Sequence, residues 1–147
     1  MKLTKGNVAF SGLEANLIKV IDAWQPPPLP TELRYRDALL DYLRANVPND
    51  CRIEKEYRHN GTTIDLFLRW NGLLLNGDVF LEVKRNLNKK TTLDRLVGQI
   101  EGLEPGKRSI VIVLVGETDR TLLDRLRAKY RAFEDAQWDR PVAIVVK

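Results

Sequence analysis

The order in which helix and strand patterns follow Pro30 narrows the fold more than any other property of this sequence. Thr31 can cap a helix that runs to about Asn46, because leucines recur there at helical spacing. Three strand patterns follow directly, over 52–58, 62–70 and 78–84. The first two are separated by His-Asn-Gly, which is typical of a hairpin turn.

The second half of the chain alternates between helices and strands. Helix patterns cover about 91–103 and 119–133, and strand patterns cover 109–115 and 142–146. The complete order is therefore α-β-β-β-α-β-α-β. Hairpin-linked strands followed by strands that alternate with helices predict an α/β fold, in which a mixed β-sheet is flanked by helices.

A separate segment precedes this region. Residues 11–25 predict a short amphipathic helix, because Ser11 and Glu14 form a capping box ahead of apolar residues at helical spacing. Four prolines in the next five residues require an extended chain. We interpret this segment as a stiff spacer, and the alternative is a ligand for an adaptor domain. We interpret 1–30 as an N-terminal helical extension and 31–147 as the main domain. The apolar face of helix 11–25 is the predicted contact for a homodimer or a larger complex.

Composition excludes several classes of protein. A chain of 147 residues with 44% hydrophobic and 30% charged residues has the apolar content of one domain with one core. Cys51 and His59 are each the only residue of their type, so neither a disulfide nor a Cys/His zinc site is predicted, and a cytoplasmic setting fits best. The first residues lack a secretory signal, and the longest apolar run, Ile110 to Val115, is too short to cross a membrane. The net charge of +4 permits an anionic partner.

The third strand pattern carries the residues that suggest chemistry. Alternation along a strand puts Glu82 and Lys84 on one face. On the neighbouring strand, Asp65 shares a face with Phe67 and Arg69, opposite to Ile64, Leu66, Leu68 and Trp70. Pairing of the two strands would bring two carboxylates and an ammonium to one place. Mg²⁺ is bound in proteins by one or two such carboxylates, together with phosphate oxygens and water.

A solvated surface pair is the simpler explanation of a Glu and a Lys two residues apart. Two observations favour a site. Glu82-Val83-Lys84 is the only Asp/Glu-x-Lys triplet in the chain, and it ends a strand that is otherwise apolar. Asp65 lies among apolar neighbours, where an unpaired carboxylate would be costly.

Asp65, followed by Phe80-Leu-Glu82-Val-Lys84, resembles the signature of the PD-(D/E)XK, or restriction-endonuclease-like, nuclease superfamily. The resemblance covers residues 31–147 and implies a restriction-endonuclease-like core. It implies that Asp65 and Glu82 are ligands of Mg²⁺, for which Mn²⁺ would substitute, and that Lys84 is the catalytic lysine. The usual proline before the motif Asp is replaced by Ile64.

The resemblance implies two further site residues. Members of the superfamily often have an acid in the first helix, for which Glu32 is the candidate and Asp37 or Asp41 the alternatives. Many members also have a glutamine in the following helix, where Gln99 lies one turn after Arg95. Leu103 replaces the tyrosine of the Gln-x-x-x-Tyr variant, and a helix-surface amide is an equally good interpretation of Gln99.

Basic residues follow the motif directly. Between Lys84 and Arg95 there are five basic residues and one acid. We expect four of them to hold a nucleic-acid backbone: Arg85, Lys89, Lys90 and Arg95. The basic residues of the last helix are interpreted as an ordinary solvated face.

The sequence therefore predicts a Mg²⁺-dependent DNA endonuclease that hydrolyses phosphodiester bonds and leaves 5′-phosphates, with RNA as an open alternative substrate. A second hypothesis is a non-catalytic nucleic-acid-binding or assembly subunit that keeps the nuclease-like fold. The presence of Asp65, Glu82 and Lys84 together argues against it, because a non-catalytic copy would be free to lose any of them.

Overall fold

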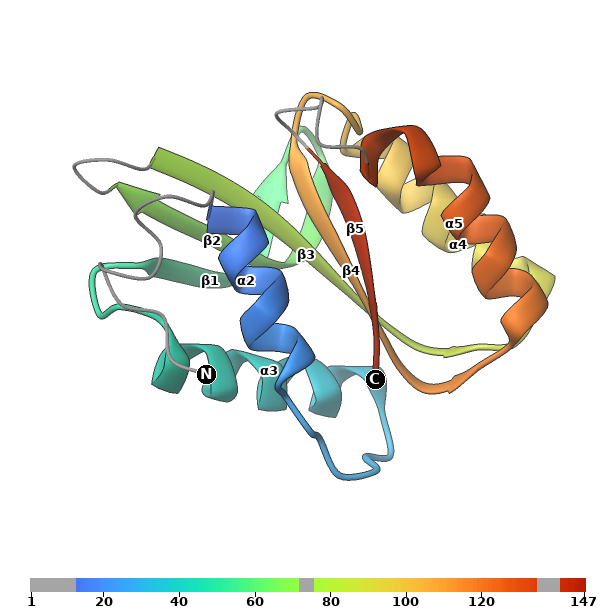
Figure 1. Ribbon diagram of the computed structural model, residues 1–147, viewed down its shortest axis with the longest axis horizontal. Coiled ribbons are helices and arrows are strands. Elements are labelled where there is room, and N and C mark those ends of the chain that lie inside the picture. Colours follow the sequence, from blue (N-terminus) through green and yellow to red (C-terminus); the bar gives the residue numbers. More distant parts are fainter. Residues whose placement is uncertain (1–12, 72–75, 135–140) are drawn as a thin grey trace.

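A computed structural model describes residues 13–71, 76–134 and 141–147 of the chain. Within them, four helices and five strands form a mixed α/β structure (Figure 1). In chain order they are α2 (Leu13–Asp22), α3 (Glu32–Asn46), β1 (Arg52–His59), β2 (Thr62–Asn71), β3 (Asn76–Leu87), α4 (Lys90–Gly102), β4 (Ser109–Thr118), α5 (Arg120–Glu134) and β5 (Val142–Val146). The order predicted after Pro30 is the order observed.

The five strands lie in one sheet in the order β1-β2-β3-β4-β5. β1, β2 and β3 are antiparallel neighbours, and β3, β4 and β5 are parallel neighbours. Crossover connections through α4 and α5 make the second half parallel, as strands separated by helices require. The mixed sheet predicted from the sequence is therefore present.

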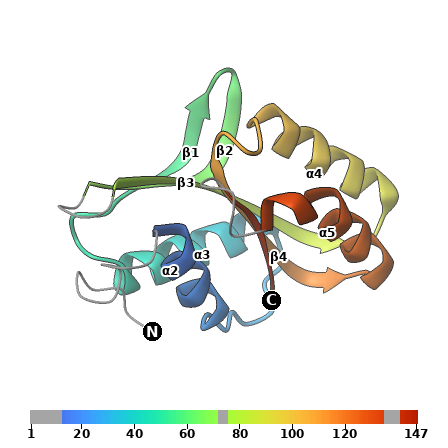
Figure 2. The same cartoon turned by 45° about the horizontal axis from the view of Figure 1, so that its top comes forward.

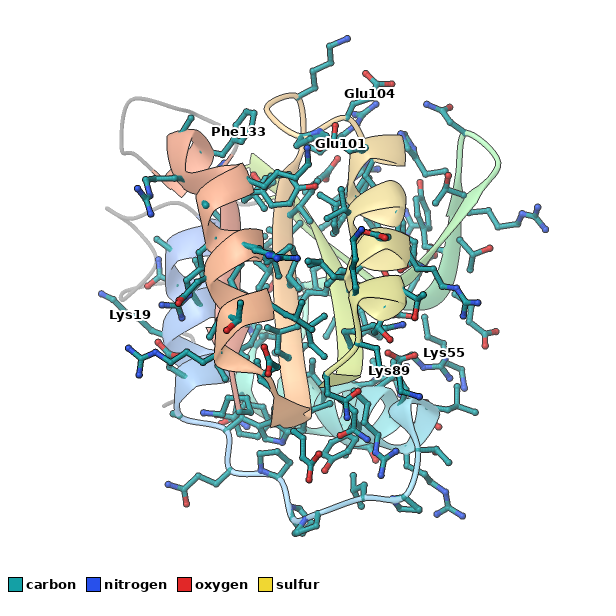
Figure 3. All side chains as sticks on the ribbon, turned by 90° about the vertical axis from the view of Figure 1, so that its right-hand side faces the viewer. Lys19, Lys55, Lys89, Glu101, Glu104 and Phe133 are labelled. Atoms are coloured by element: carbon teal, nitrogen blue, oxygen red, sulfur yellow. The ribbon has the colours of Figure 1, made fainter. Side chains whose placement is uncertain are left out.

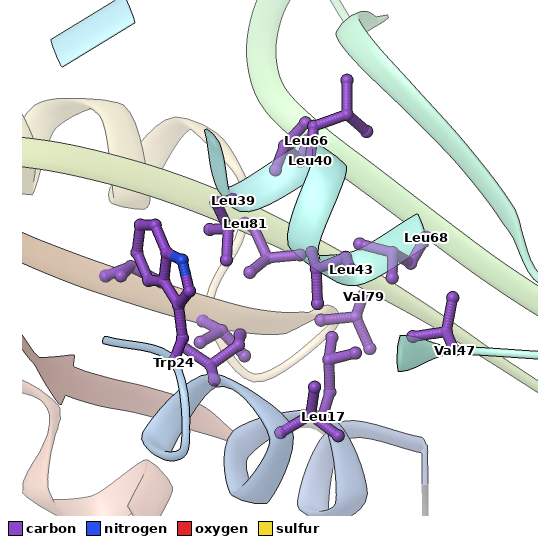
Figure 4. Close-up of a cluster of buried hydrophobic side chains, with 14 of the residues drawn as sticks. Leu17, Trp24, Leu39, Leu40, Leu43, Val47, Leu66, Leu68, Val79 and Leu81 are labelled. Carbon is purple, nitrogen blue, oxygen red and sulfur yellow. The ribbon is translucent and has the colours of Figure 1, made fainter. Parts of the chain in front are cut away.

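Helices cover both faces of the sheet (Figure 1, Figure 2). α2 and α3 pack against Val79, Leu81 and Val83 on one face (Figure 4), and α4 and α5 pack against Phe80 and Ile112 on the other. β3 therefore alternates as predicted, and β4 is buried on both sides along most of its length. None of the helices in the described ranges is long and apolar enough to cross a membrane.

The apolar face of α2 is not available to a partner subunit, so the predicted contact through this face is wrong. Leu17, Val20 and Ile21 are fully buried in the same core as α3 and the sheet, and Trp24 is nearly so. The physical reason is that the extended prolines lead the chain back along the domain, where the Leu29 N–H donates to the Tyr35 hydroxyl at 3.0 Å. Ser11 of the predicted capping box lies outside the described residues. The boundary at residue 30 stays a prediction.

The sheet opens where β2 leaves β3. The β2–β3 ladder ends at the pair Leu66 and Leu81, and the β1–β2 ladder skips the position of Glu56 and Asp65. Glu56 has a positive φ of 54°, which interrupts the strand locally. Beyond this point Ile64 belongs to the cluster on the α4 and α5 side, together with Phe67. The predicted placement of Ile64 with Leu66 is therefore wrong, because the interruption reverses the alternation.

Candidate active site

Asp65 and Glu82 meet at this opening of the sheet. They follow directly on the last pair of the β2–β3 ladder, and the Asp65 N–H donates to Glu82 Oε1 at 3.3 Å. The Val83 N–H in turn donates to Asp65 Oδ2 at 2.8 Å. Each carboxylate therefore accepts a backbone hydrogen bond from the strand of the other. The structure brings together the two residues predicted to bind metal.

Glu32 joins this pair from the first turn of α3. The helix begins here because the Thr31 side chain accepts a hydrogen bond from the Arg34 N–H, as predicted from the sequence. Glu32 Oε1 accepts a hydrogen bond from the Arg85 N–H at 3.0 Å and lies 3.5 Å from Lys84 Nζ. Three carboxylates thus lie along β3 from Glu82 to Arg85. This stretch pairs with β4 on one edge, and its other edge no longer pairs with β2.

The other two acids considered for the first helix have different surroundings. Asp37 accepts two hydrogen bonds from Arg36, and these bonds lower the pKa of its carboxyl group. Asp41 is exposed on α3. Among the three candidates, Glu32 is the one that the structure joins to Lys84.

Glu82 is the most strongly perturbed group of the site. Its side chain is only 4% exposed. Burial, followed by the negative charge of Asp65, raises the pKa of Glu82 to about 9. The two carboxyl groups thus oppose each other's ionisation, and a positive charge beside them would favour the ionised form of Glu82.

The donor set suits a hard divalent cation. Asp65 and Glu82 offer carboxylate oxygens, and Mg²⁺ accepts one or two such ligands when water and phosphate oxygens complete its shell. Across the described residues, no three His, Cys, Asp or Glu side chains are close enough to enclose a metal by themselves. Asp65 and Glu82 could therefore supply two of the oxygen ligands of such a cation.

Gln99 is not joined to this cluster. It is exposed on α4, as is Arg95, and α4 turns Leu93, Leu96 and Ile100 inward. The described contacts contain no hydrogen bond from Gln99 to Asp65, Glu82 or Lys84. Its place on α4 agrees with a helix-surface amide, and its catalytic role stays a prediction.

Three of the four basic residues predicted to hold nucleic acid are exposed: Lys89, Lys90 and Arg95. Lys89 is the N-cap of α4, no side chain caps this end, and the first turn holds no acid. Figure 3 shows Lys89 at the start of α4 and Lys55 of β1 on the same side of the molecule. Arg85 differs, because its side chain is half-buried and its Nε is enclosed without a hydrogen bond.

Arg36 is a residue beside the site that was not predicted from the sequence. This residue is 6% exposed, and its guanidinium bonds to Asp37 on α3 and to Glu56 on β1. One signal was present in the sequence, since Arg36 shares the helical spacing of the buried residues Leu39, Leu40 and Leu43. A charged residue inside an apolar stripe indicates a buried ion pair.

No protein-family model and no curated protein matches the chain. Two solved structures are similar to it: the MspJI restriction endonuclease in complex with a 27-mer oligonucleotide, and the DNA modification-dependent restriction endonuclease AspBHI. Sequence identities are 13% and 19%, and TM-scores are 0.40 and 0.38. Each match covers 99% of this chain but only 30% and 36% of the other. The chain spans about a third of these proteins, and similarities at this level assign neither its fold family nor its function.

Proposed function

We propose that this chain is a nuclease domain of restriction-endonuclease-like fold that hydrolyses phosphodiester bonds in DNA with the help of Mg²⁺. The observation that carries the proposal is the meeting of Asp65 and Glu82 where β2 leaves β3, with Lys84 two residues further along. Mn²⁺ should replace Mg²⁺, because it accepts the same oxygen ligands.

Asp65 and Glu82 would hold the metal. The bound ion would supply a polarised phosphate and an acidified water. Lys84, held 3.5 Å from Glu32, would orient that water and offset negative charge on the phosphate. Attack of the water oxygen on phosphorus would break the bond to O3′, so the products are a 5′-phosphate and a 3′-hydroxyl. The water proton passes to solvent, and O3′ takes one up.

The start of α4 supports DNA as the substrate. A helix N-terminus carries partial positive charge and usually has an acid or a hydroxyl side chain at its end. Here Lys89 and Lys90 occupy those positions, and no side chain caps the helix. This arrangement costs stability in the free protein and suits a phosphate from outside.

One observation favours the alternative of a non-catalytic subunit. Asp65, Glu82 and Glu32 all accept backbone hydrogen bonds from the open part of the sheet, so each has a structural role in addition to any chemistry. A protein that lost catalysis could keep all three for that reason. Lys84 discriminates better between the hypotheses, because among the described residues its side chain pairs with Glu32 and makes no hydrogen bond to the backbone of the sheet.

The test is cleavage of labelled duplex, branched and single-stranded DNA with Mg²⁺, Mn²⁺ or EDTA. Wild type is compared with Lys84→Met, which keeps the length of the side chain, and with Lys107→Met, an exposed residue beyond α4. Cutting that needs metal and is lost only in Lys84→Met would support the nuclease. DNA binding without cutting under every metal would favour the non-catalytic subunit, and RNA in the same assay tests the other substrate.

A further inference from the structure

Arg36 and Glu56 connect α3 to β1 beside the opening of the sheet. The two residues are 20 apart in sequence, and Arg36 Nη1 donates to Glu56 Oε1 at 3.0 Å. The side chain of Arg36 is only 7% exposed, whereas that of Glu56 is 60% exposed. The guanidinium is therefore enclosed by the protein, and its carboxylate partner reaches in from the surface.

Both ends of this connection adjoin residues of the candidate site. Arg36 lies one helical turn after Glu32, which contacts Lys84 and the Arg85 N–H. Glu56 lies opposite Asp65, at the position that the β1–β2 ladder skips. Its positive φ of 54° is uncommon for a residue other than glycine and persists only where surrounding contacts hold it.

The remaining bonds of Arg36 fix its orientation. Nε and Nη2 both donate to Asp37 Oδ1, at 3.2 and 2.8 Å. A planar guanidinium held by three hydrogen bonds to two carboxylates has little rotational freedom. A surface ion pair of two mobile side chains would not constrain the backbone in this way.

We infer that Arg36 is a positioning residue, which ties α3 to the interrupted position of β1 and thereby holds Glu32 and Asp65 against the open part of β3. Arg36 touches neither Lys84 nor Glu82 in the described contacts. It therefore acts through the positions of Glu32 and Asp65. The inference deepens the proposed function, and only its consequence for cleavage rests on that function.

Three backbone amides report on this arrangement without any activity assay. The N–H groups of Asp65, Val83 and Arg85 each donate to a carboxylate of the site. Amide hydrogen exchange of the full chain, measured by NMR, follows each of them separately. In Arg36→Met, we expect the amides of Val83 and Arg85 to exchange about tenfold faster than in wild type, while Ile112 in the core is unchanged.

The matched control is Arg44→Met on the same helix, where the side chain is exposed. Equal exchange in the two variants would overturn the inference. If Arg36→Met does not fold, Glu56→Ala decides, because Glu56 is mostly exposed and its truncation removes the acceptor of Arg36 Nη1 while the guanidinium stays in place. Val83 and Arg85 amides that exchange as in wild type in this variant would also overturn the inference.

Activity provides an independent second measurement. Arg36→Met should lower kcat for DNA cleavage and weaken Mn²⁺ binding, with KM for DNA little changed, because the side chain of Arg36 is enclosed by the protein. Arg36→Lys keeps the charge but not the planar fork, so it should restore only part of the loss. If Arg36→Lys restored kcat completely, the hydrogen bonds of the guanidinium to Asp37 and Glu56 would not be required for positioning. A wild type without nuclease activity would refute the proposed function and leave the exchange experiment valid.

Discussion

Lys84 Nζ lies 3.5 Å from Glu32 Oε1, although the two residues belong to different layers of the fold. Glu32 begins α3 on one face of the sheet, and Lys84 lies on β3 beyond its last pair with β2. The same Glu32 oxygen accepts the Arg85 N–H at 3.0 Å. The first helix is thus joined to the motif strand by both a side chain and a backbone amide.

This relationship predicts a role for the charge of Glu32. Glu32→Gln keeps an oxygen for the Arg85 N–H but loses the attraction for Lys84. We expect kcat for DNA cleavage to fall about tenfold or more, with KM little changed, because the ammonium loses its fixed position. Steady-state cleavage assays measure both constants. Asp41→Asn, on the exposed side of α3, should leave both near wild type, and an equal loss there would contradict the assignment to Glu32.

The raised pKa of Glu82 predicts that the metal-free protein loses stability as pH rises. The unfolded chain releases this proton near pH 4.5, and the folded protein holds it until about pH 9. Folding therefore favours the protonated form, and the stabilisation present below pH 4.5 is lost progressively between these two values. From about pH 6 to about pH 8 the loss is up to about 3 kcal/mol in the free energy of unfolding.

Urea unfolding at the two pH values measures this loss. Glu82→Gln keeps an oxygen for the Asp65 N–H and cannot ionise, so its stability should change much less with pH. A wild type and a variant with the same pH dependence would show that Glu82 is already ionised in the free protein.

Metal binding should release a proton at neutral pH. Glu82 must lose its proton to become a ligand, because a metal binds the carboxylate and not the acid. We expect the affinity for Mn²⁺ to increase with pH up to about pH 9, the value for the Glu82 pKa. Calorimetry in buffers of different ionisation enthalpy counts the released protons. Glu82→Gln should bind Mn²⁺ weakly and release none, and unchanged binding would remove Glu82 from the ligand set.

The lysines at the start of α4 should bind DNA through its backbone. The double substitution Lys89→Gln with Lys90→Gln should weaken binding to all sequences alike and reduce the slope of log K against log salt by about 1 to 2. Fluorescence anisotropy across a salt series measures the slope. Lys107→Gln, an exposed lysine beyond the other end of α4, is the control. A similar change in the control would indicate a general effect of charge.

α2 should be needed for folding. Leu17 is fully buried between α2 and the sheet, so Leu17→Ala should lower the free energy of unfolding by about 2 to 5 kcal/mol. Leu33 is 55% exposed on α3, and Leu33→Ala should have little effect. Urea denaturation compares them. If both variants lost only a small and similar amount of the free energy of unfolding, α2 would be a loosely attached extension that the fold does not need.

Local patterns in the sequence were sufficient to predict the order of helices and strands and the placement of Asp65 beside Glu82. Thr31 caps α3 as predicted, because a cap depends on neighbours three residues away. Val79, Leu81 and Val83 lie on one face of β3 and Phe80 on the other, as the strand alternation predicts, because this alternation is a property of the backbone. Asp65 could be placed beside Glu82 because short hairpin-linked strands pair with each other.

Other features depended on contacts between distant segments. The sequence assigned an apolar face to α2, but only the packing of the whole domain placed Leu17 in the core and not against another subunit. The break at Glu56 and Asp65, which moved Ile64 to the opposite face, has no local signal, because a non-glycine residue with positive φ is held there by tertiary contacts. Glu32 lies beside Lys84 because the first turn of α3 meets β3 there, whereas Asp37 is bonded to Arg36 of its own helix. Periodicity and capping are local and can be read along the chain, whereas the partner of a buried charge is set by where the layers meet.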